Sequence, residues 1–338
     1  MADQFHLVER VVDGHRGGLV LLDAHDLARF VVVGDVVGHD TEAAAAMGQM
    51  RSLLRGIAVH EYAANLIKKT VDGTGHAGKG QVRAMVSHLL EAGADANAPL
   101  TMGETPLMTA ARAGDLDTVR LLLAHGADVE ATERDRRQTA LMWAVAQGHA
   151  AVAQVLIEHG ADVHARSAVW DQLENTAGNT NPIGNFRMSH GGSTPLLFAA
   201  RHGDIETARV LIEAGADPND TAAAGTSALV VAAHSGHGPL GIFLLEQGAD
   251  PNATDAGYAA LHAAVLRSQV ELVDALLAHG ADVNAILKHG TPGRRFSADY
   301  SLRYQLIGAN AFWLAARYGE VDIIRLLASQ GATPLAIP

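Results

Sequence analysis

The tripeptide Gly-Ala-Asp recurs along this chain of 338 residues at Gly93, Gly126, Gly160, Gly215, Gly248 and Gly280, with a Gly-Ala-Thr variant at Gly331. The spacings are 33, 34, 55, 33, 32 and 51 residues, so the two long ones exceed one period by 22 and 18 residues. A second marker, related to Thr-Pro-Leu, keeps the same step and begins at Thr105, Thr139, Thr194, Ser227, Ala259 and Asn310. Two markers in one register indicate a true internal repeat of about 33 residues, interrupted by two insertions.

Each period predicts two short helices followed by a hairpin. Thr105 can accept hydrogen bonds from the free amides of a first helix, and Pro106 at the next position costs no helical hydrogen bond. Gly114 can end this helix in the left-handed conformation. Apolar residues then recur at helical spacing from Leu116 to Leu123, and the second helix ends at Gly126.

These segments resemble the ankyrin repeat, whose fingerprint T-P-L-H-x-A-A is matched most closely by TPLMTAA, TPLLFAA and AALHAAV. The resemblance covers residues 81–335, with a half-repeat over 81–98 and six repeats over 103–335, interrupted by insertions at 166–192 and 286–308. It implies an all-α solenoid of stacked helix pairs with hairpin loops over 81–338. The segments TPLLFAAR and AFWLAARYGEVDI are also similar to bacterial ankyrin repeat proteins as a group, a likeness that carries no activity.

The chain departs from the fingerprint at several positions. The fingerprint histidine occurs only at His262. Arg137 stands where a turn glycine is expected, and Ser268 replaces the glycine between two helices. These substitutions put the local backbone geometry in question, while the fold assignment stands.

Residues 1–80 break the repeat pattern and form a separate N-terminal segment. Valine-rich runs and a helical stretch fit a small α/β cap, whereas the different composition fits a poorly ordered segment. The run from Gly73 to Gly80 is similar to a phosphate-binding loop, but Gly80 stands where that loop needs a hydroxyl group for magnesium. We therefore interpret the run as a linker.

Composition and charge exclude several classes of function. The chain has 25 basic and 37 acidic residues, a formal net charge of -12, which argues against nucleic acid and anionic membranes as partners. The absence of cysteine excludes thiolate chemistry and disulfides. The N-terminus MADQFHLVERVVDGH lacks the features of an export signal, so we expect a cytoplasmic protein; a missing native start would reopen a periplasmic or secreted location.

The 18 histidines do not indicate a metal site. His60 and Glu61 begin a zinc-protease-like pair, but Ala64 occupies the position of the second ligand. His125, His159 and His279 form one column of the repeat, and His149 and His237 form another. Stacked repeats lie about 10 Å apart, too far to share a metal with bonds of about 2.1 Å. We expect no metal and no cofactor, and histidines that form hydrogen bonds at the surface or between repeats.

The two insertions are the candidate binding sites, because a solenoid presents a long concave face to which hairpins project, and such faces usually bind protein. The second insertion carries four basic residues and one acidic residue, in contrast to the acidic array. Five of the 15 aromatic residues lie in the two insertions. The candidate partner-binding residues are Trp170, Phe186, Arg187, Arg294, Arg295, Phe296, Tyr300, Arg303 and Tyr304.

The sequence therefore predicts a non-enzymatic, monomeric scaffold that binds another protein through its concave surface and two insertions. An alternative for the insertions is structural: their aromatic residues fold onto the helices and their arginines pair with nearby acids. Two alternative functions remain. The first is an enzyme, either through the N-terminal α/β segment or as a subunit or regulatory domain of a catalytic assembly. The second is a binder of a small anionic ligand, through the basic insertion.

Overall fold

The computed structural model describes residues 79–91, 93–175, 185–291 and 302–334. The chain divides into two units, Met1–Val59 and His60–Pro338, and every described residue lies in the second. The two alternatives for the N-terminal segment therefore lie outside the described residues. Only its last two residues are described, and they belong to helix α3 (Lys79–Glu91), so the linker interpretation is wrong at Lys79 and Gly80.

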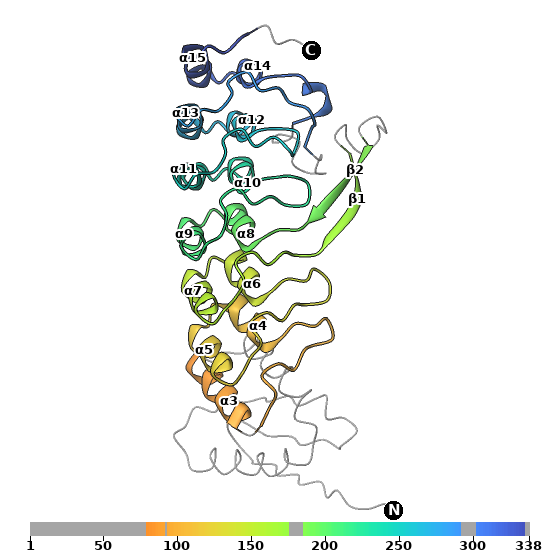
Figure 1. Ribbon diagram of the computed structural model, residues 1–338, viewed down its shortest axis with the longest axis vertical. Helices are drawn as coiled ribbons and strands as arrows, with labels where there is room; N and C mark the ends of the chain where they lie inside the picture. Colours follow the sequence, from red (N-terminus) through yellow and green to blue (C-terminus); the bar gives the residue numbers. More distant parts are fainter. Residues whose placement is uncertain (1–78, 92, 176–184, 292–301, 335–338) are drawn as a thin grey trace, which may run out of the picture. The chain divides into compact units, whose positions relative to one another are not determined.

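The helices alternate between two columns that run along the array (Figure 1). The inner column consists of α4 (Pro106–Ala113), α6 (Ala140–Ala146), α8 (Pro195–His202), α10 (Ala228–Ser235), α12 (Ala260–Leu266) and α14 (Ala311–Tyr318). The outer column consists of α5 (Leu116–Ala124), α7 (Ala150–Glu158), α9 (Ile205–Glu213), α11 (Gly238–Glu246), α13 (Val270–Ala278) and α15 (Val321–Ser329). Helix α3 packs against α5 as the outer helix of the half-repeat. The predicted ankyrin-like solenoid is thereby confirmed.

The predicted helix ends are present in the structure. Thr105 Oγ1 accepts a hydrogen bond from the Met108 amide, and Gly114 ends α4 with a φ of 66°. Arg137 and Ser268 also adopt positive φ values, 52° and 54°. Both residues thus keep the left-handed geometry that glycine favours, so the departures in sequence do not alter the local fold.

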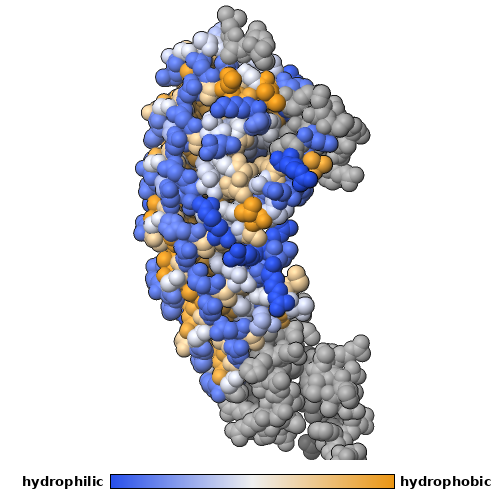
Figure 2. Space-filling view, turned by 45° about the vertical axis from the view of Figure 1, so that its right-hand side comes forward, coloured by the Kyte–Doolittle hydropathy of each residue, from blue (hydrophilic) through white to orange (hydrophobic). Residues whose placement is uncertain are grey.

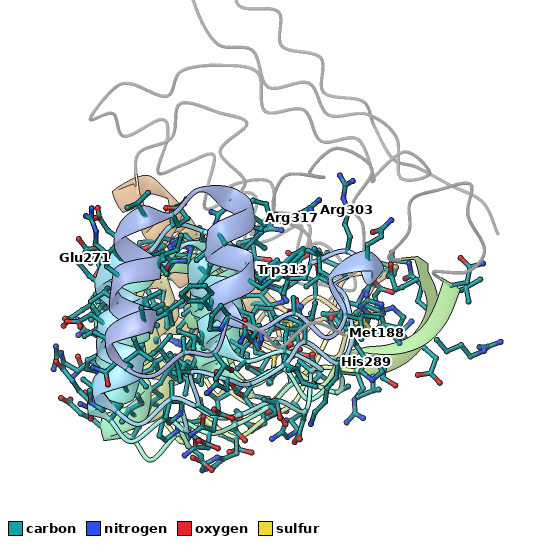
Figure 3. All side chains as sticks on the ribbon, turned by 90° about the horizontal axis from the view of Figure 1, so that it is seen from above. Met188, Glu271, His289, Arg303, Trp313 and Arg317 are labelled. Carbon is teal, nitrogen blue, oxygen red and sulfur yellow. The ribbon has the colours of Figure 1, made fainter. Side chains whose placement is uncertain are left out.

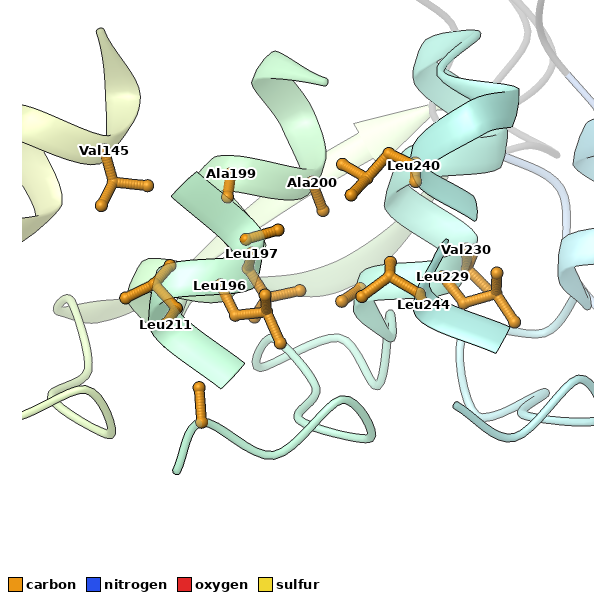
Figure 4. Packing of buried hydrophobic residues seen from close by; sticks show 14 of the residues in the cluster. Val145, Leu196, Leu197, Ala199, Ala200, Leu211, Leu229, Val230, Leu240 and Leu244 are labelled. Atoms are coloured by element: carbon orange, nitrogen blue, oxygen red, sulfur yellow. The ribbon is translucent and has the colours of Figure 1, made fainter. Parts of the chain in front are cut away.

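The core is a thin layer of small and branched apolar side chains between neighbouring helix pairs. Figure 4 shows Leu196 and Leu211 in one repeat and Leu229, Leu240 and Leu244 in the next. All five are at most 1% exposed. Because each layer is only two helices deep, alanine and leucine can fill it without bulky aromatic residues.

Hydrogen bonds between successive hairpins tie the repeats together. The Asn219 side chain accepts from the Asp250 amide at 2.7 Å and donates to the Gly248 carbonyl at 3.2 Å. Asn97 and Asn252 repeat this pattern. His164 occupies the equivalent position before the first insertion, and its side chain forms no such bond to the described residue Asp217. Among the described residues, the side-chain hydrogen bond between these two hairpins is therefore absent.

The first insertion forms an antiparallel hairpin of strands β1 (Val169–Asn175) and β2 (Asn185–Gly191). Its register pairs Val169 with Gly191 and Trp170 with His190. The two strands are not apparent from the sequence, which predicts an inserted loop here. In Figure 1 this hairpin projects from the stack on the side of the inner helices. The second insertion includes a short 3₁₀ helix, η3 (Tyr304–Leu306).

Candidate interaction surface

The inner face of the array is the surface formed by the inner helices, the hairpin loops and the two insertions. Half-buried aromatic side chains occur along it, among them Trp143, Phe198 and Trp313. The Arg112 guanidinium lies 4.9 Å from the Trp143 ring centroid, and Arg317 lies 5.6 Å from that of Trp313. Such cation–π contacts order both partners at the surface.

Trp170 is held in place on the β1–β2 hairpin. The Arg136 guanidinium, from the preceding hairpin loop, lies 4.0 Å from its ring centroid, and the His190 ring stacks on it at 5.7 Å. His190 Nε2 lies 3.0 Å from Glu174 Oε1 on the opposite strand. Trp170 remains 36% exposed. The ring is thus fixed in orientation yet accessible to a partner.

The other face of β1 carries two exposed apolar side chains, one on each side of Asp171. Val169 and Leu173 alternate along the strand with Trp170, so they point to the side opposite to its ring. They are 60% and 62% exposed. Exposed apolar side chains of this size on a two-stranded hairpin have no core to join, and they form part of a candidate contact patch.

The base of the first insertion is anchored to the next repeat. Arg166 donates from Nη1 to the carbonyls of Gly192 and Thr221 and from Nη2 to Asp220 Oδ1 at 2.7 Å. Ala168 also donates its amide to the Arg136 carbonyl. The hairpin is therefore bound to the repeats on both sides of it.

The ends of the second insertion are packed into the array. Leu287, Leu302 and Leu306 are buried, and Thr291 Oγ1 accepts from the Leu302 amide at 2.8 Å. Arg303 is exposed between these buried residues. These leucines anchor both ends of the insertion in the array, and the structural alternative, which concerns the aromatic residues and arginines of the insertion, stays a prediction.

The structure places only part of the predicted binding set. Trp170 and Arg187 lie on opposite strands of the hairpin, and Arg187 is exposed. Phe186 pairs with Glu174 in the ladder, and Tyr304 begins η3; their side chains, like Arg294, Arg295, Phe296 and Tyr300 entirely, lie outside the described residues. Sequence reasoning missed Arg136 and Leu173, because their roles depend on the strand register.

The histidines of the two columns form hydrogen bonds with backbone carbonyls, as the sequence predicts. His125, His159 and His279 direct Nδ1 to the carbonyl four residues earlier, at 2.8–2.9 Å. His149 and His237 reach the carbonyls of Arg112 and Arg201 in the preceding repeat, both at 3.1 Å. Among the described residues, no group of three or more acidic or histidine side chains could hold a metal ion.

Two buried titratable groups lie between repeats. Burial lowers the pKa of His262 to about 4, although its hydrogen bonds with Ala285 and Ala259 oppose the shift. Burial also raises the pKa of Tyr258 to about 12. Tyr258 packs edge-on against His234 with ring centroids 6.2 Å apart. Both groups are therefore neutral near pH 7.

The repeats and their stacking define the class of protein. The family model of ankyrin repeats, in three copies, matches residues 76–167 and again 196–287, which together make more than half of the chain. The protein belongs to the ankyrin repeat family. Among solved structures, the crystal structure of the human ASB11 ankyrin repeat domain is similar, with a TM-score of 0.57 and 20% identity over 82% of this chain and 99% of that one. This likeness shows the fold alone.

A second family match lies in the N-terminal part of the chain. The family model of the crossover junction endodeoxyribonuclease RuvC matches residues 15–102. The RuvC protein of Rhodopseudomonas palustris strain TIE-1 is 39% identical over 94 residues, 26% of this chain and 54% of the relative. That of Beijerinckia indica is 41% identical over 90 residues, 25% of this chain and 51% of the relative. The chain thus spans about half the length of the relatives it matches here.

The RuvC match corrects the prediction that the protein is not an enzyme. The valine-rich runs, the helical stretch and the short motifs of the N-terminal segment give no sign of similarity to a nuclease. The relatives are named as endodeoxyribonucleases of crossover junctions, which is a property of those proteins. Within the described ranges, no helix combines the length and apolar character needed to cross a bilayer.

Proposed function

We propose that the array binds a partner protein across its inner face, with the β1–β2 hairpin as the main contact. The observation that carries this proposal is an aromatic ring fixed between Arg136 and His190 on one face of the hairpin, with exposed apolar residues of β1 on the other face. Tryptophan and arginine contribute more binding energy at interfaces than most residue types. A pre-ordered hairpin also loses little conformational freedom on binding.

The second insertion extends the same site. Arg303 is exposed, and the neighbouring Arg294, Arg295, Phe296, Tyr300 and Tyr304 provide basic and aromatic side chains in its sequence. Arginine can donate paired hydrogen bonds to a carboxylate or phosphate. In this proposal the hairpin supplies apolar contacts, together with Phe186 and Arg187, and the second insertion supplies charge.

Affinity capture with quantitative mass spectrometry tests the proposal. The full chain is compared with a hairpin variant, Trp170→Ala with Leu173→Asp, and with Val321→Ser, which removes an exposed apolar residue of α15, 55% exposed and outside the proposed site. We expect at least one protein to be captured by the wild type and by Val321→Ser but reduced at least tenfold by the hairpin variant. Equal capture by all three chains would contradict the proposal.

We propose a second function for the segment over residues 15–102: binding of branched DNA. The RuvC match supports it, and so does local charge, because residues 51–83 contain six basic and two acidic residues in a chain of net charge -12. Basic side chains bind the phosphate backbone and make affinity dependent on salt. Lys68 and Lys69 lie in this stretch.

Binding and cleavage of a synthetic four-way DNA junction test the second function. The assay uses the full chain with and without Mg²⁺, since phosphodiester cleavage commonly uses divalent ions. We expect the junction to bind more tightly than linear duplex of the same length, and Lys68→Gln with Lys69→Gln to weaken binding. Equal affinity for junction and duplex, or no effect of the double variant, would argue against it.

A further inference from the structure

Within the described ranges, the edges of the β1–β2 hairpin are unpaired over most of their length. A two-stranded ladder uses only alternate backbone groups of each strand, so the other amides and carbonyls point outward. At the base of the hairpin, the Arg136 carbonyl accepts from the Ala168 amide, and the Gly191 carbonyl accepts from the Ala223 amide. Beyond these two bonds, no described residue outside the hairpin forms a backbone hydrogen bond with β1 or with residues 185–190.

Strand β1 is the more open of the two strands. Its residues 169–173 are all exposed, whereas Met188, Ser189 and His190 of β2 are half-buried. Figure 3 shows Met188 and the hairpin on the same side of the array as Trp313 and opposite Glu271. The accessible edge is therefore that of β1, on the side of the inner helices.

Strand β1 lacks most of the features that protect an edge strand. Natural sheets cover their edges, or place proline, lysine or a bulge in them. Strand β1 is seven residues long, contains no proline or lysine, and pairs with β2 in continuous register. Of its two acidic residues, Glu174 pairs with His190 inside the hairpin, while Asp171 is exposed. Figure 2 shows strongly hydrophilic residues next to apolar ones on the face that includes the hairpin.

From this arrangement we infer that β1 receives an extended segment of a partner protein, which adds to its edge as the third strand of the sheet. Backbone hydrogen bonds to the outward groups of β1 supply affinity, and alternate side chains supply specificity. A third strand also stabilises the hairpin, because two strands alone are marginally stable. The Arg136 carbonyl occupies the base of the edge, so the added strand covers residues 170–175. The inference rests on the proposed protein-binding function and specifies how the hairpin makes contact.

Charge distinguishes a partner protein from a second copy of this chain. Strand β1 carries two acidic residues and no basic one, so pairing it with β1 of a second copy would bring like charges together. The residue of the added strand that pairs with Asp171 should therefore be neutral or basic. The residue that pairs with Leu173 should be apolar, because Leu173 is 62% exposed. These two partner residues are two positions apart and lie on one face of the added strand.

Selection from a random library of displayed 12-residue peptides tests the inference with the full chain. Leu173→Thr removes the apolar contact but keeps a residue that favours strands. Val321→Thr is the matched control, because it makes a comparable change at an exposed apolar position of α15. We expect the selected peptides to bind the wild type and Val321→Thr equally, and to bind Leu173→Thr at least tenfold more weakly.

N-methylation of a selected peptide separates strand addition from docking by side chains alone. One version carries N-methyl groups on its odd-numbered residues and the other on its even-numbered residues, so each blocks one set of alternate amides. Strand addition predicts that only one of the two versions loses binding, by at least tenfold. Alternate amides of residues 170–175 should also become protected from hydrogen exchange when the unmodified peptide binds.

Four results would contradict the inference. Equal effects of the two methylated versions, or peptides unaffected by Leu173→Thr, would overturn it and leave the proposed function intact. Protection of alternate β1 amides in the free chain would overturn it as well, since the edge would then already be occupied. A dimer that Leu173→Thr dissociates, seen by light scattering, would replace the partner strand with a second copy. Failure to select any peptide would count against both the inference and the proposed function.

Discussion

His262 makes the stability of the fifth repeat depend on pH. Its side chain is fully buried; Nδ1 accepts from the Ala259 amide at 3.1 Å, and Nε2 lies 3.0 Å from the Ala285 carbonyl. In the unfolded chain the imidazole binds a proton below its ordinary pKa of 6.5, whereas in the folded chain it does so only near 4. Lowering the pH through this window therefore favours the unfolded state.

The size of the effect follows from the pKa difference. A shift of one pKa unit corresponds to about 1.4 kcal/mol, so the stabilisation that is complete above pH 6.5 decreases by roughly 3 kcal/mol as the pH falls to 4. Between pH 8 and pH 5 the loss is about 2 kcal/mol. Other histidines and carboxylates titrate in the same range, so the effect must be isolated by a matched variant.

His262→Met is that variant, because Met108 and Met142 occupy the equivalent position of the first two repeats. Met108 Sδ accepts from the Thr105 amide at 3.4 Å, so methionine can take over the bond of Nδ1. The Ala285 carbonyl loses its donor, which should cost about 1–3 kcal/mol near neutral pH.

Urea unfolding of the full chain, followed by circular dichroism from pH 8 to pH 5, measures the difference between the two proteins. Amide exchange over residues 260–266 assigns that difference to the fifth repeat. We expect the advantage of the wild type to shrink by about 2 kcal/mol across this range. A difference between the two proteins that stays constant with pH would refute the reasoning.

Three further changes test the backbone, the hairpin ladder and the other buried titratable group. Arg137→Gly should raise the free energy of unfolding by about 1 kcal/mol in urea titration, because the left-handed conformation at φ 52° strains a side chain with a Cβ atom. A decrease would show that the arginine side chain stabilises this turn. His164→Asn should form the side-chain hydrogen bonds to the next hairpin that His164 lacks, which should raise the thermal midpoint and the free energy of unfolding, the latter by about 1 kcal/mol. An unchanged midpoint would show that the neighbouring hairpin is out of reach of the asparagine side chain. Tyr258→Phe should remove a loss of stability between pH 10 and 12, because the wild-type phenol, with its pKa raised to about 12, ionises first in the unfolded chain. Parallel alkaline denaturation curves would contradict this assignment.

The sequence was sufficient to predict the solenoid because its determinants are local and periodic. Thr105 and Gly114 specify where a helix begins and ends, and residues of similar capping character recur at most steps. Even the exceptions follow the register, since Arg137 and Ser268 adopt the conformation of the glycines they replace. No long-range information was needed to count the repeats.

The interaction surface was predictable only in part, because it depends on contacts between residues far apart in sequence. Trp170 was identified by type and by its place in an insertion. Its orientation depends on Arg136, 34 residues earlier, and on His190 across the hairpin. Neither contact can be deduced without the strand register. The RuvC relationship was missed for a different reason, since it is carried by similarity of a whole segment and not by a short motif.

The RuvC match and the array share helix α3, and this overlap has a testable consequence. Residues 76–102 belong to both family matches. Val86 of α3 is 1% exposed and belongs to the same buried cluster as Val119 and Leu122 of α5. Packing of the first repeat and of the last part of the nuclease-like segment therefore depends on one helix.

Val86→Ala should lower the stability of the array by about 1–2 kcal/mol and also weaken binding of the four-way DNA junction. Val273→Ala in α13, where the side chain is 0% exposed, removes the same two methyl groups far from the overlap and should cost similar stability while leaving junction binding unchanged. Urea titration and fluorescence anisotropy with labelled junction measure the two effects. If both variants affect DNA binding equally, α3 has no special role, and the nuclease-like segment depends on the array only through its general stability.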